Sequence, residues 1–552
     1  MSNVPLKCYH KTILPLTDLR FCVFQMPLVD CPHNQVITSP TIHPTALPWC
    51  RQTRAPVLKW ALYIREKRAM GGRQQRWVVN CSSPWERLLD LGGIDQLHRH
   101  VTIEILPDDI LLRIFDFYLY DANYDRWHTL VHVSRRWRNV VFASPRRLNL
   151  QLLCRYRSVR EMLDIWPELP IVITYDGVPE MMEGVIAALE LNDRVSRIDF
   201  WQYSRSSSEL ERLVAEMQVS FPVLRDLEIW SFDETAPVIS DSFLGGSAPR
   251  LQYLDLRGIP FPTLPNLLLS ATDLIDIRLL NIPHSGYFSP EAMVTCLAAL
   301  TRLESLFLGF RSPQSRPSRA GRRRPPLTHT ILPGLTHLYF KGVTEYLEDL
   351  LAQVDVPLLE DIEITFLNQL IFDVLQLPKF ICRTTKFTVL DQADVVLEAN
   401  TIAIGVTLSQ EAGIVDPTRF KLEISCRTLD WQLSSLAQVC NPAFSNLSTL
   451  ERLNIHDNQR SPPHCQDDME NIQWLKLFHP FTTIKNLYLS KEVARHVAPA
   501  LQELTGQRVT EVLPALQNIY LDGLQLSGPV QKAIGQFVAA RQLSGYPVAI
   551  HR

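Results

Sequence analysis

The stretch Leu251-Gln-Tyr-Leu-Asp-Leu, residues 251–256, decides how most of this chain folds. Its apolar residues occupy positions 1, 4 and 6 of the stretch. Side chains alternate between the two faces of an extended strand, so this pattern predicts a strand with one buried face. The pattern recurs along the chain. Clear copies begin at Leu224, Leu251, Leu274, Leu303, Leu335, Leu359, Leu450, Ile484 and Leu516, and weaker copies begin at Val195, Thr384 and Arg419.

The copies follow one another at spacings of 23 to 35 residues, with a mean near 29. Helix-like segments lie between them, for example over 207–218, 290–300 and 344–354. In five copies a proline stands two residues before the first apolar position, where it ends a helix and favours an extended entry into the strand. These prolines are Pro222, Pro249, Pro333, Pro357 and Pro514. The repetition predicts an α/β solenoid over 151–552, with parallel strands on one wall and helices on the other.

This array resembles leucine-rich repeats, at the long end of their range of roughly 20–29 residues. It departs from that family at the ninth position, where a buried Asn is common and this chain has residues such as Phe232 and Ile259. We therefore expect an irregular variant. The strand wall is the default binding surface, at positions 2, 3 and 5 of each unit. Candidate residues are Arg225, Asp226, Glu228, Gln252, Tyr253, Asp255, Thr336, His337, Tyr339, Glu360, Asp361 and Glu363.

Two insertions interrupt the array. Residues 311–326 contain six arginines and no acidic residue, which predicts a solvated loop, with nuclear import or phosphate contact as the alternative. Residues 391–409 contain two short β-rich runs, which predict a hairpin inserted between repeats.

A different pattern precedes the array, over 103–150. Pro107 suits the first position of a helix, and Asp108 and Asp109 suit its first turn, where they interact favourably with the helix dipole. A second helical stretch, 127–142, contains a turn and should place Leu130, Val133, Trp137 and Val140 or Val141 on one face. A unit of about forty-five residues buries little apolar surface alone, so its remaining apolar side chains should contact a partner or the next domain.

Segment 103–150 resembles an F-box. The matching features are Leu-Pro, an acidic residue, a paired aliphatic, Ile-Phe, and a later Val-x-Arg-x-Trp helix. The sequence of this segment is similar to that of F-box-like proteins expanded in mushroom-forming fungi. Two departures are Ser134, where many members have Cys, and a link lengthened by 121–126. By resemblance, the residues that pack the box or face the adaptor are Leu106, Pro107, Ile110, Leu111, Ile114, Phe115, Leu130, Val133 and Trp137. The alternative is that all of them form the core of a small bundle.

The resemblance implies a substrate receptor of a ubiquitin ligase. The box would dock on a Skp-type adaptor, and through it on a cullin, while the repeats hold an unknown protein target. The receptor would perform no covalent step and would raise the local concentration of target lysines near the conjugating enzyme. The alternative is a repeat scaffold whose box does not engage the adaptor.

Composition limits the other possibilities. Residues 1–102 form a basic extension that we expect to be poorly ordered: the first hundred carry thirteen Lys or Arg and six Asp or Glu, which leaves a net charge of −10 for the rest of a chain whose total is −3. That acidic remainder opposes nucleic-acid binding. Eleven scattered cysteines without a CxxC pair, and the lack of a signal peptide or membrane span, predict free thiols in a reducing compartment, cytoplasmic or nuclear.

No catalytic motif is present. The chain lacks a phosphate-binding glycine loop, a metalloprotease motif, a kinase signature set and a nucleophile elbow, and no cysteines or histidines stand at metal-ligand spacing. We therefore expect a binding protein rather than an enzyme, with no catalytic residue, metal or cofactor.

Overall fold

A computed structural model describes a large part of the chain, and all described residues belong to one compact unit, Trp77–Arg552. The predicted extension 1–102 and most of the predicted loop 311–326 lie outside the described residues, as does most of the link 121–126. The described ranges are 106–121, 127–154, 159–202, 207–233, 235–313, 329–367, 369, 371–384, 386–387, 391–407, 419–425, 429–444, 449–458, 471–521 and 528–551.

Three helices come first, as the sequence predicts: α2 (Asp108–Asp121), α3 (Trp127–Val131) and α4 (Arg135–Ala143). The carbonyl oxygen of Pro107 accepts the N–H of Leu111 at 3.0 Å, so Pro107 precedes the first helical residue by one position. Ser134 caps α4, because its side chain accepts the N–H of Trp137 at 3.2 Å. The hydroxyl of Ser134 thus stabilises the start of α4.

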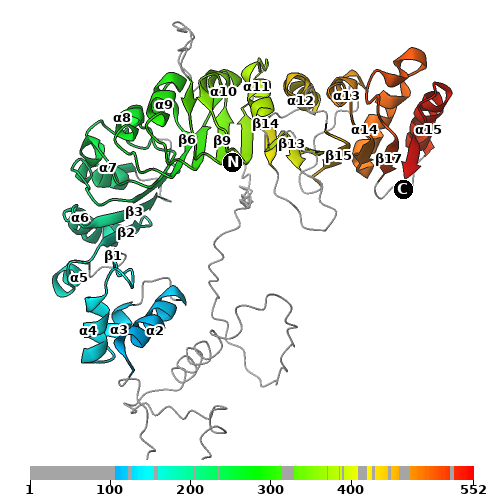
Figure 1. The fold of residues 1–552 in the computed structure, drawn as a ribbon. Coiled ribbons are helices and arrows are strands. Elements are labelled where there is room, and N and C mark those ends of the chain that lie inside the picture. Colours follow the sequence, from blue (N-terminus) through cyan, green and yellow to red (C-terminus); the bar gives the residue numbers. More distant parts are fainter. Residues whose placement is uncertain are drawn as a thin grey trace, which may run out of the picture. The chain divides into compact units, whose positions relative to one another are not determined.

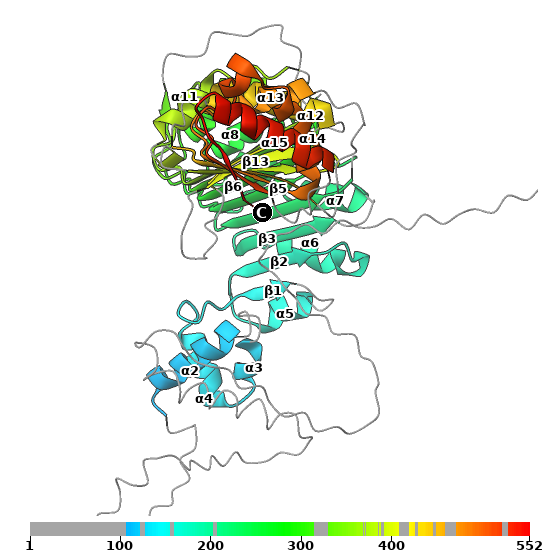
Figure 2. The same ribbon diagram turned by 90° about the vertical axis from the view of Figure 1, so that its right-hand side faces the viewer.

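The rest of the described chain forms a long sheet of sixteen strands (Figure 1). Neighbours pair in parallel except on both sides of β13. Figure 2 shows the first strands following one another side by side. In spatial order the strands are β1 (Leu152–Cys154), β2 (Ile171–Tyr175), β3 (Val195–Gln202), β4 (Asp226–Ser231), β5 (Tyr253–Arg257), β6 (Asp276–Ile282), β7 (Ser305–Phe310), β9 (His337–Gly342), β11 (Asp361–Phe366), β14 (Phe420–Ser425), β13 (Thr401–Thr407), β12 (Gln392–Leu397), β15 (Arg452–Asp457), β16 (Asn486–Leu489), β17 (Asn518–Leu521) and β18 (Ala549–His551).

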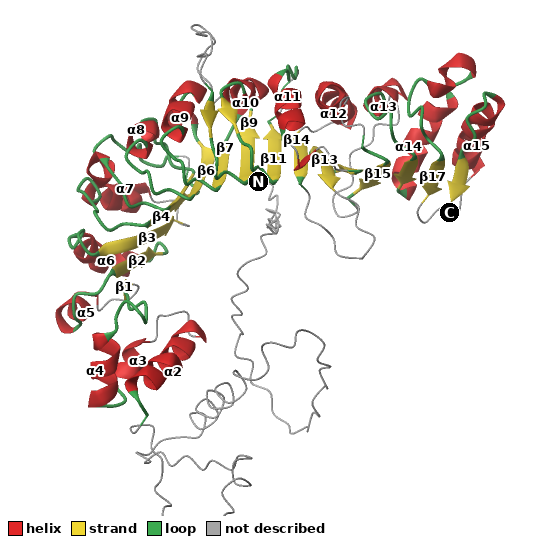
Figure 3. Ribbon diagram, in the orientation of Figure 1, coloured by secondary structure: helices red, strands yellow, loops and turns green. Residues whose placement is uncertain are grey.

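Helices cover one face of this sheet, and Figure 3 shows no described helix on the opposite face. The helices are α5 (Val159–Ile165), α6 (Met182–Leu189), α7 (Ser207–Glu216), α8 (Leu264–Leu268), α9 (Pro290–Leu297), α10 (Thr344–Leu351), α11 (Gln376–Arg383), α12 (Leu429–Phe444), α13 (Asn471–Phe478), α14 (Lys491–Gln502) and α15 (Gly528–Leu543). Short 3₁₀ helices are η4 (Pro179–Met181), η5 (Phe243–Gly246), η6 (His284–Gly286) and η9 (Gly506–Thr510), and β8 (Thr330–Ile331) pairs with β10 (Val354–Asp355) in a separate small sheet.

The core lies between the strands and the helices. In all nine clear copies of the repeat, the residues at positions 1, 4 and 6 are exposed by 5% or less. Burial at this spacing follows from the alternation of side chains along each strand. The predicted α/β solenoid is therefore confirmed.

The second predicted insertion is confirmed as a hairpin, because β12 and β13 pair antiparallel. The hairpin is part of the main sheet. Strand β14 pairs with β11, and β12 pairs with β15, so the three strands appear in space in the reverse of their chain order. The weaker copy at Arg419 is strand β14. Half of the copy at Thr384 lies outside the described residues, and the strand that follows it in the structure is β12.

Candidate functional site

Helix α2 has two apolar stripes. Leu111, Phe115 and Leu119 are fully buried and face the other helices. Ile110 and Phe117 are 38% and 51% exposed, and Ile114 between them is half-buried. Residues 110, 114 and 117 are four and three positions apart, so they lie on one side of the helix. Phe117 was missed from the sequence, although its spacing from Ile110 and Ile114 could have identified it.

The predicted adaptor residues therefore divide into two groups. Leu111, Phe115, Leu130 and Trp137 are core residues of the three-helix segment Leu106–Ala143, which is called the box below. Pro107 and Ile110 are exposed, and Leu106 and Ile114 are half-buried. The expectation that Val133 shares the buried face of Leu130 and Trp137 is wrong: Val133 is 56% exposed, because the chain turns between α3 and α4 and rotates it outward.

The start of α2 is held by α4. The Nη2 of Arg136 donates to the carbonyl oxygen of Leu106 and to the Oδ1 of Asp108, each at 2.6 Å. Deeper in the box, the rings of Phe115 and Trp137 lie 4.7 Å apart between centroids. These contacts fix the Leu106–Asp108 turn relative to the second half of the box.

The box packs directly on the first repeat. The indole N–H of Trp127 donates to the carbonyl oxygen of Gln151 at 2.7 Å, and its ring lies 5.0 Å from that of Trp166 between centroids. Trp127 is 3% exposed. Part of the apolar surface of the box is thus covered by the repeat domain, as the small size of the box requires.

The strand wall is the second candidate surface. Register places position 5 of successive repeats side by side, so that Glu228 lies between Asp199 and Asp255. Most of the candidate residues on this wall are at least partly exposed, but Glu228 and Asp255 are buried, at 8% and 0%. Their predicted exposure is wrong, because neighbouring side chains on the wall cover them.

Arginines on the same strands neutralise several of these carboxylates. The closest N–O distances are 2.9 Å for Arg197 with Asp199, 2.8 Å for Arg257 with Asp255 and 3.0 Å for Arg278 with Asp276. Each arginine is two residues from its acid, on the same face of the strand.

Aromatic rings lie among these ion pairs. The rings of Trp201 and Trp230 stack at 5.7 Å between centroids. The guanidinium carbon of Arg257 lies over the Trp230 ring, 3.8 Å from its centroid. Further along, the guanidinium of Arg278 lies 4.7 Å from the ring of Phe307. Trp201, Trp230 and Arg257 occupy position 7 of their repeats. The sequence pattern ended at position 6. Continuing the outward-facing alternation from position 5 to position 7 would have found them.

Two carboxylates of β4 differ from their neighbours. Neither Asp226 nor Glu228 forms an ion pair with any residue that the structure describes. Glu228 accepts one hydrogen bond, from the indole N–H of Trp201 at 2.9 Å. Burial, with the nearby charges of Asp255 and Asp199, raises the pKa of Glu228 to about 7. Burial also raises the pKa of Asp226, and Arg197 and Arg225 oppose that shift.

The wall changes character toward its C-terminal end. There Tyr488, Tyr520 and His551 form a continuous stack, with centroid distances of 4.2 Å and 4.6 Å. Asn518 donates to Asn486 at 2.8 Å in the adjacent row. This end is neutral and aromatic, whereas strands β3–β6 are rich in charge.

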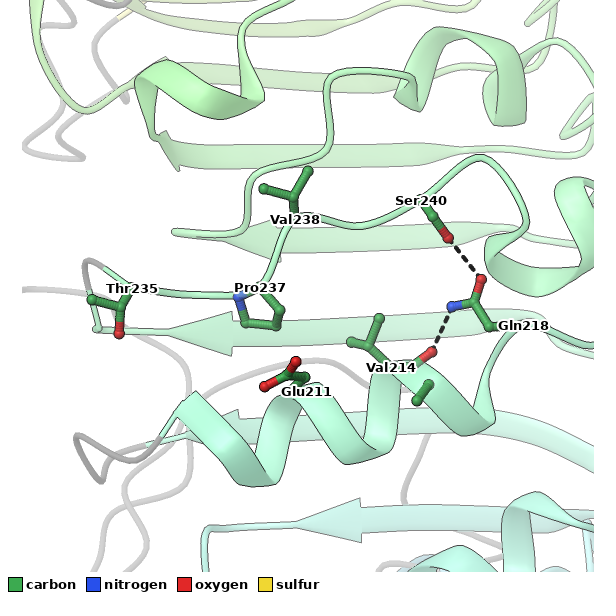
Figure 4. A pocket seen from close by; sticks show the side chains of 8 residues that line it. Glu211, Val214, Gln218, Thr235, Pro237, Val238 and Ser240 are labelled. Carbon is green, nitrogen blue, oxygen red and sulfur yellow. Dashed lines mark hydrogen bonds between the residues drawn. The ribbon is translucent and has the colours of Figure 1, made fainter.

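A shallow groove of about 540 Å³ lies on the helix-covered side, between α7 and segment 235–240 (Figure 4). Gln218 spans it, accepting a hydrogen bond from Ser240 and donating one to the carbonyl oxygen of Val214, each at 2.7 Å. Its lining includes Glu211 and contains no histidine, cysteine or lysine.

Within the described ranges, no group of three or more His, Cys, Asp or Glu side chains is placed to hold a metal ion. None of the helices described is long and apolar enough to cross a membrane. Of the four described cysteines, Cys154, Cys296 and Cys440 are buried free thiols, and Cys382 is exposed.

No protein-family model and no curated protein sequence matches this chain. Among solved structures, the leucine-rich repeat-containing protein LegL7 from Legionella pneumophila is similar, with 16% sequence identity and a TM-score of 0.25. The alignment covers 72% of this chain and 98% of that chain. Because this TM-score is low, the solenoid described above rests on this chain's own strands and helices.

Proposed function

We propose that this protein is the substrate-recognition subunit of a Skp-cullin-F-box ubiquitin ligase. The three-helix box would dock on the Skp-type adaptor and through it on a cullin, and the strand wall would hold a protein target. The proposal places the protein in the cytoplasm or nucleus, where such a ligase would act on intracellular targets.

The observation that carries the adaptor proposal is the outward stripe of α2. Ile110, Ile114 and Phe117 present apolar side chains on the side of the helix that the box core leaves uncovered. Complete burial of such side chains in an interface is favourable by about 1.5–3 kcal/mol each. The stripe follows the Leu106-Pro107 turn, which Arg136 holds in place. Pro107 and Ile110, two of the motif residues that remain exposed, are thus close to each other at the start of α2.

The strand wall supports the second half of the proposal. Repeat proteins use such extended walls as binding surfaces, because each repeat adds a row of side chains to one face. Here the wall offers charged, aromatic and amide side chains in register over many strands. A receptor of this kind needs no catalytic group, since it acts by bringing target lysines close to the conjugating enzyme.

Affinity capture tests the adaptor proposal. The full chain is immobilised and incubated with a purified Skp-type adaptor. We compare it with Ile110→Asp/Phe117→Asp, and with Ile165→Asp as a control of the same chemistry at the end of α5, where Ile165 is 70% exposed. We expect the double variant to lose binding by about a hundredfold or more. The control should bind like the unmodified chain.

Two results would contradict the proposal. One is absence of adaptor binding by the unmodified chain, which would favour a repeat scaffold whose box has no adaptor. The other is unchanged binding in both the α2 double variant and Leu106→Ala/Pro107→Ala. Circular dichroism of each variant shows whether its helices remain formed.

A further inference from the structure

The outward face of strands β3–β6 carries more negative than positive charge. Within the strand bounds, five carboxylates face three guanidinium groups. The carboxylates are Asp199, Asp226, Glu228, Asp255 and Asp276, and the guanidinium groups belong to Arg197, Arg257 and Arg278. Each arginine pairs with an acid two residues away, so Asp199, Asp255 and Asp276 each form an ion pair. Asp226 and Glu228, both on β4, remain without an ion pair among the described residues, and the charges of Arg197 and Arg225 act on Asp226 only at longer range.

These two carboxylates form one small surface. They are two residues apart on a strand, so their side chains point to the same face. Asp226 is half-buried and reachable from solvent, whereas Glu228 is 8% exposed and accepts a hydrogen bond from Trp201. Trp230 continues the row on β4, and its ring stacks on that of Trp201. The indole N–H of Trp230 is buried and has no acceptor among the described residues, so β4 contains another polar group without a hydrogen bond.

Such an arrangement is costly without a partner. Like charges directly opposite each other on neighbouring strands destabilise a sheet, and Glu228 has an acid opposite it on both sides. A buried carboxylate also loses hydration, and a cation placed against it offsets that loss. An aromatic ring beside the carboxylates adds attraction for a cation.

We propose that the face of β3–β6 around Asp226 and Glu228 binds a basic, extended segment of the target, with a lysine or arginine side chain placed against these two carboxylates. This inference rests on the proposed use of the strand wall to hold a target, and it names the chemistry of that target. The charge of the face selects the partner, because an acidic segment would meet two acids that have no ion pair with a described residue.

The same wall contains a matched control. Asp361 and Glu363 occupy the equivalent rows on β11. They already have cations: Asp361 lies 3.6 Å from Arg419, and Glu363 lies 2.6 Å from the Nζ of Lys421. Asp361 also lies 3.1 Å from the Nε2 of His337. Neutralising these two acids is the same chemical change at a place where no cation is missing.

Fluorescence anisotropy with the full chain tests this inference. The probes are an alternating lysine–serine peptide and a glutamine–serine peptide of equal length. We expect the lysine peptide to bind more tightly than the glutamine peptide. Asp226→Asn/Glu228→Gln should weaken the lysine peptide by about tenfold. Asp361→Asn/Glu363→Gln should change its affinity by less than about twofold.

Equal losses in both double variants would overturn the inference, because they would show attraction to net charge alone. Equal binding of the two peptides would also overturn it. The single variant Asp226→Asn guards against misfolding, because it alters only the half-buried acid and should give part of the loss. The adaptor is absent from this measurement, so failure of the adaptor proposal and failure of the basic-segment proposal are separate outcomes.

Discussion

The indole N–H of Trp201 donates to the carboxylate of Glu228 across strands β3 and β4, with 2.9 Å between Nε1 and Oε1. It is the one hydrogen bond that Glu228 forms with the described residues, and it comes from a neutral donor. The flanking acids Asp199 and Asp255 each have an arginine. Trp201 therefore holds the carboxylate in place without neutralising its charge.

Glu228 should make stability depend on pH. Its pKa rises from an ordinary value of 4.5 to about 7 on folding, because burial and two neighbouring acids disfavour the ionised form. The folded state thus retains a proton that the unfolded state releases, so Glu228 reduces stability as pH rises through this window, by at most on the order of 3 kcal/mol. We expect Glu228→Gln to raise the melting temperature at about pH 8 by a few degrees, with a smaller gain near pH 5.

Differential scanning fluorimetry across this pH range measures the effect. Glu363→Gln is the control, since it removes an ion pair with Lys421 and should give no gain at high pH. A melting temperature of Glu228→Gln that follows the unmodified chain at every pH would show that the Glu228 carboxylate is not strained by its surroundings.

Phe115 should be essential to the box. Its ring is fully buried and contacts Trp137 of α4, whereas Phe117, two residues later on the same helix, is 51% exposed. Phe115→Ala should cost about 3–5 kcal/mol, because it leaves a cavity in a small core. Phe117→Ala should cost less than about 1 kcal/mol. Hydrogen exchange over residues 108–143 compares the two, and similar protection in both variants would contradict this assignment of the buried face.

Gly258 should tolerate no side chain. Its φ of +71° is in the left-handed region, and a Cβ there would lie 2.2 Å from the carbonyl oxygen of Ser231. Gly258→Ala should therefore destabilise by about 2–5 kcal/mol. Gly506 has a φ of +58° and open space around the added atom, so Gly506→Ala should cost only about 1 kcal/mol. Urea denaturation measures both, and equal midpoints would refute the steric explanation.

Arg541 should stabilise the last repeats. Its side chain is 1% exposed and donates to four backbone carbonyl oxygens at 3.0–3.4 Å, those of Val509, Leu513, Pro514 and Leu516. Arg541→Met leaves these buried acceptors without a donor and should cost about 2–4 kcal/mol. Arg541→Lys should lose less, since the ammonium still donates.

The effect of Arg541→Met should stay local, because each repeat of a solenoid contacts mainly its neighbours. Hydrogen exchange should rise in α15, β17 and β18 and remain unchanged in β3–β6. Arg495→Met is the control, because Arg495 pairs with Glu492 on the surface of α14. Increased exchange throughout the array would show that the repeats unfold as one unit.

The sequence alone determined the repeating element and its buried side. Leu251, Leu254 and Leu256 are buried as predicted, because alternation along a strand is a local property that the chain carries in its own residue order. The same holds for the stripe of Leu111 and Phe115 on α2. The hairpin of β12 and β13 was also predictable, since two neighbouring β-rich runs pair locally.

The tertiary structure decided which residues distant in the sequence lie next to each other. The reversed order of β12, β13 and β14, the burial of Glu228 and Asp255, and the outward turn of Val133 all depend on neighbours that local periodicity does not specify. Cross-strand register joins residues about one repeat apart, and it alone places Trp201 beside Glu228. Asp226 and Glu228 form no ion pair with the described residues. The sequence therefore located the wall, and packing between strands determined which of its charged side chains are paired or buried.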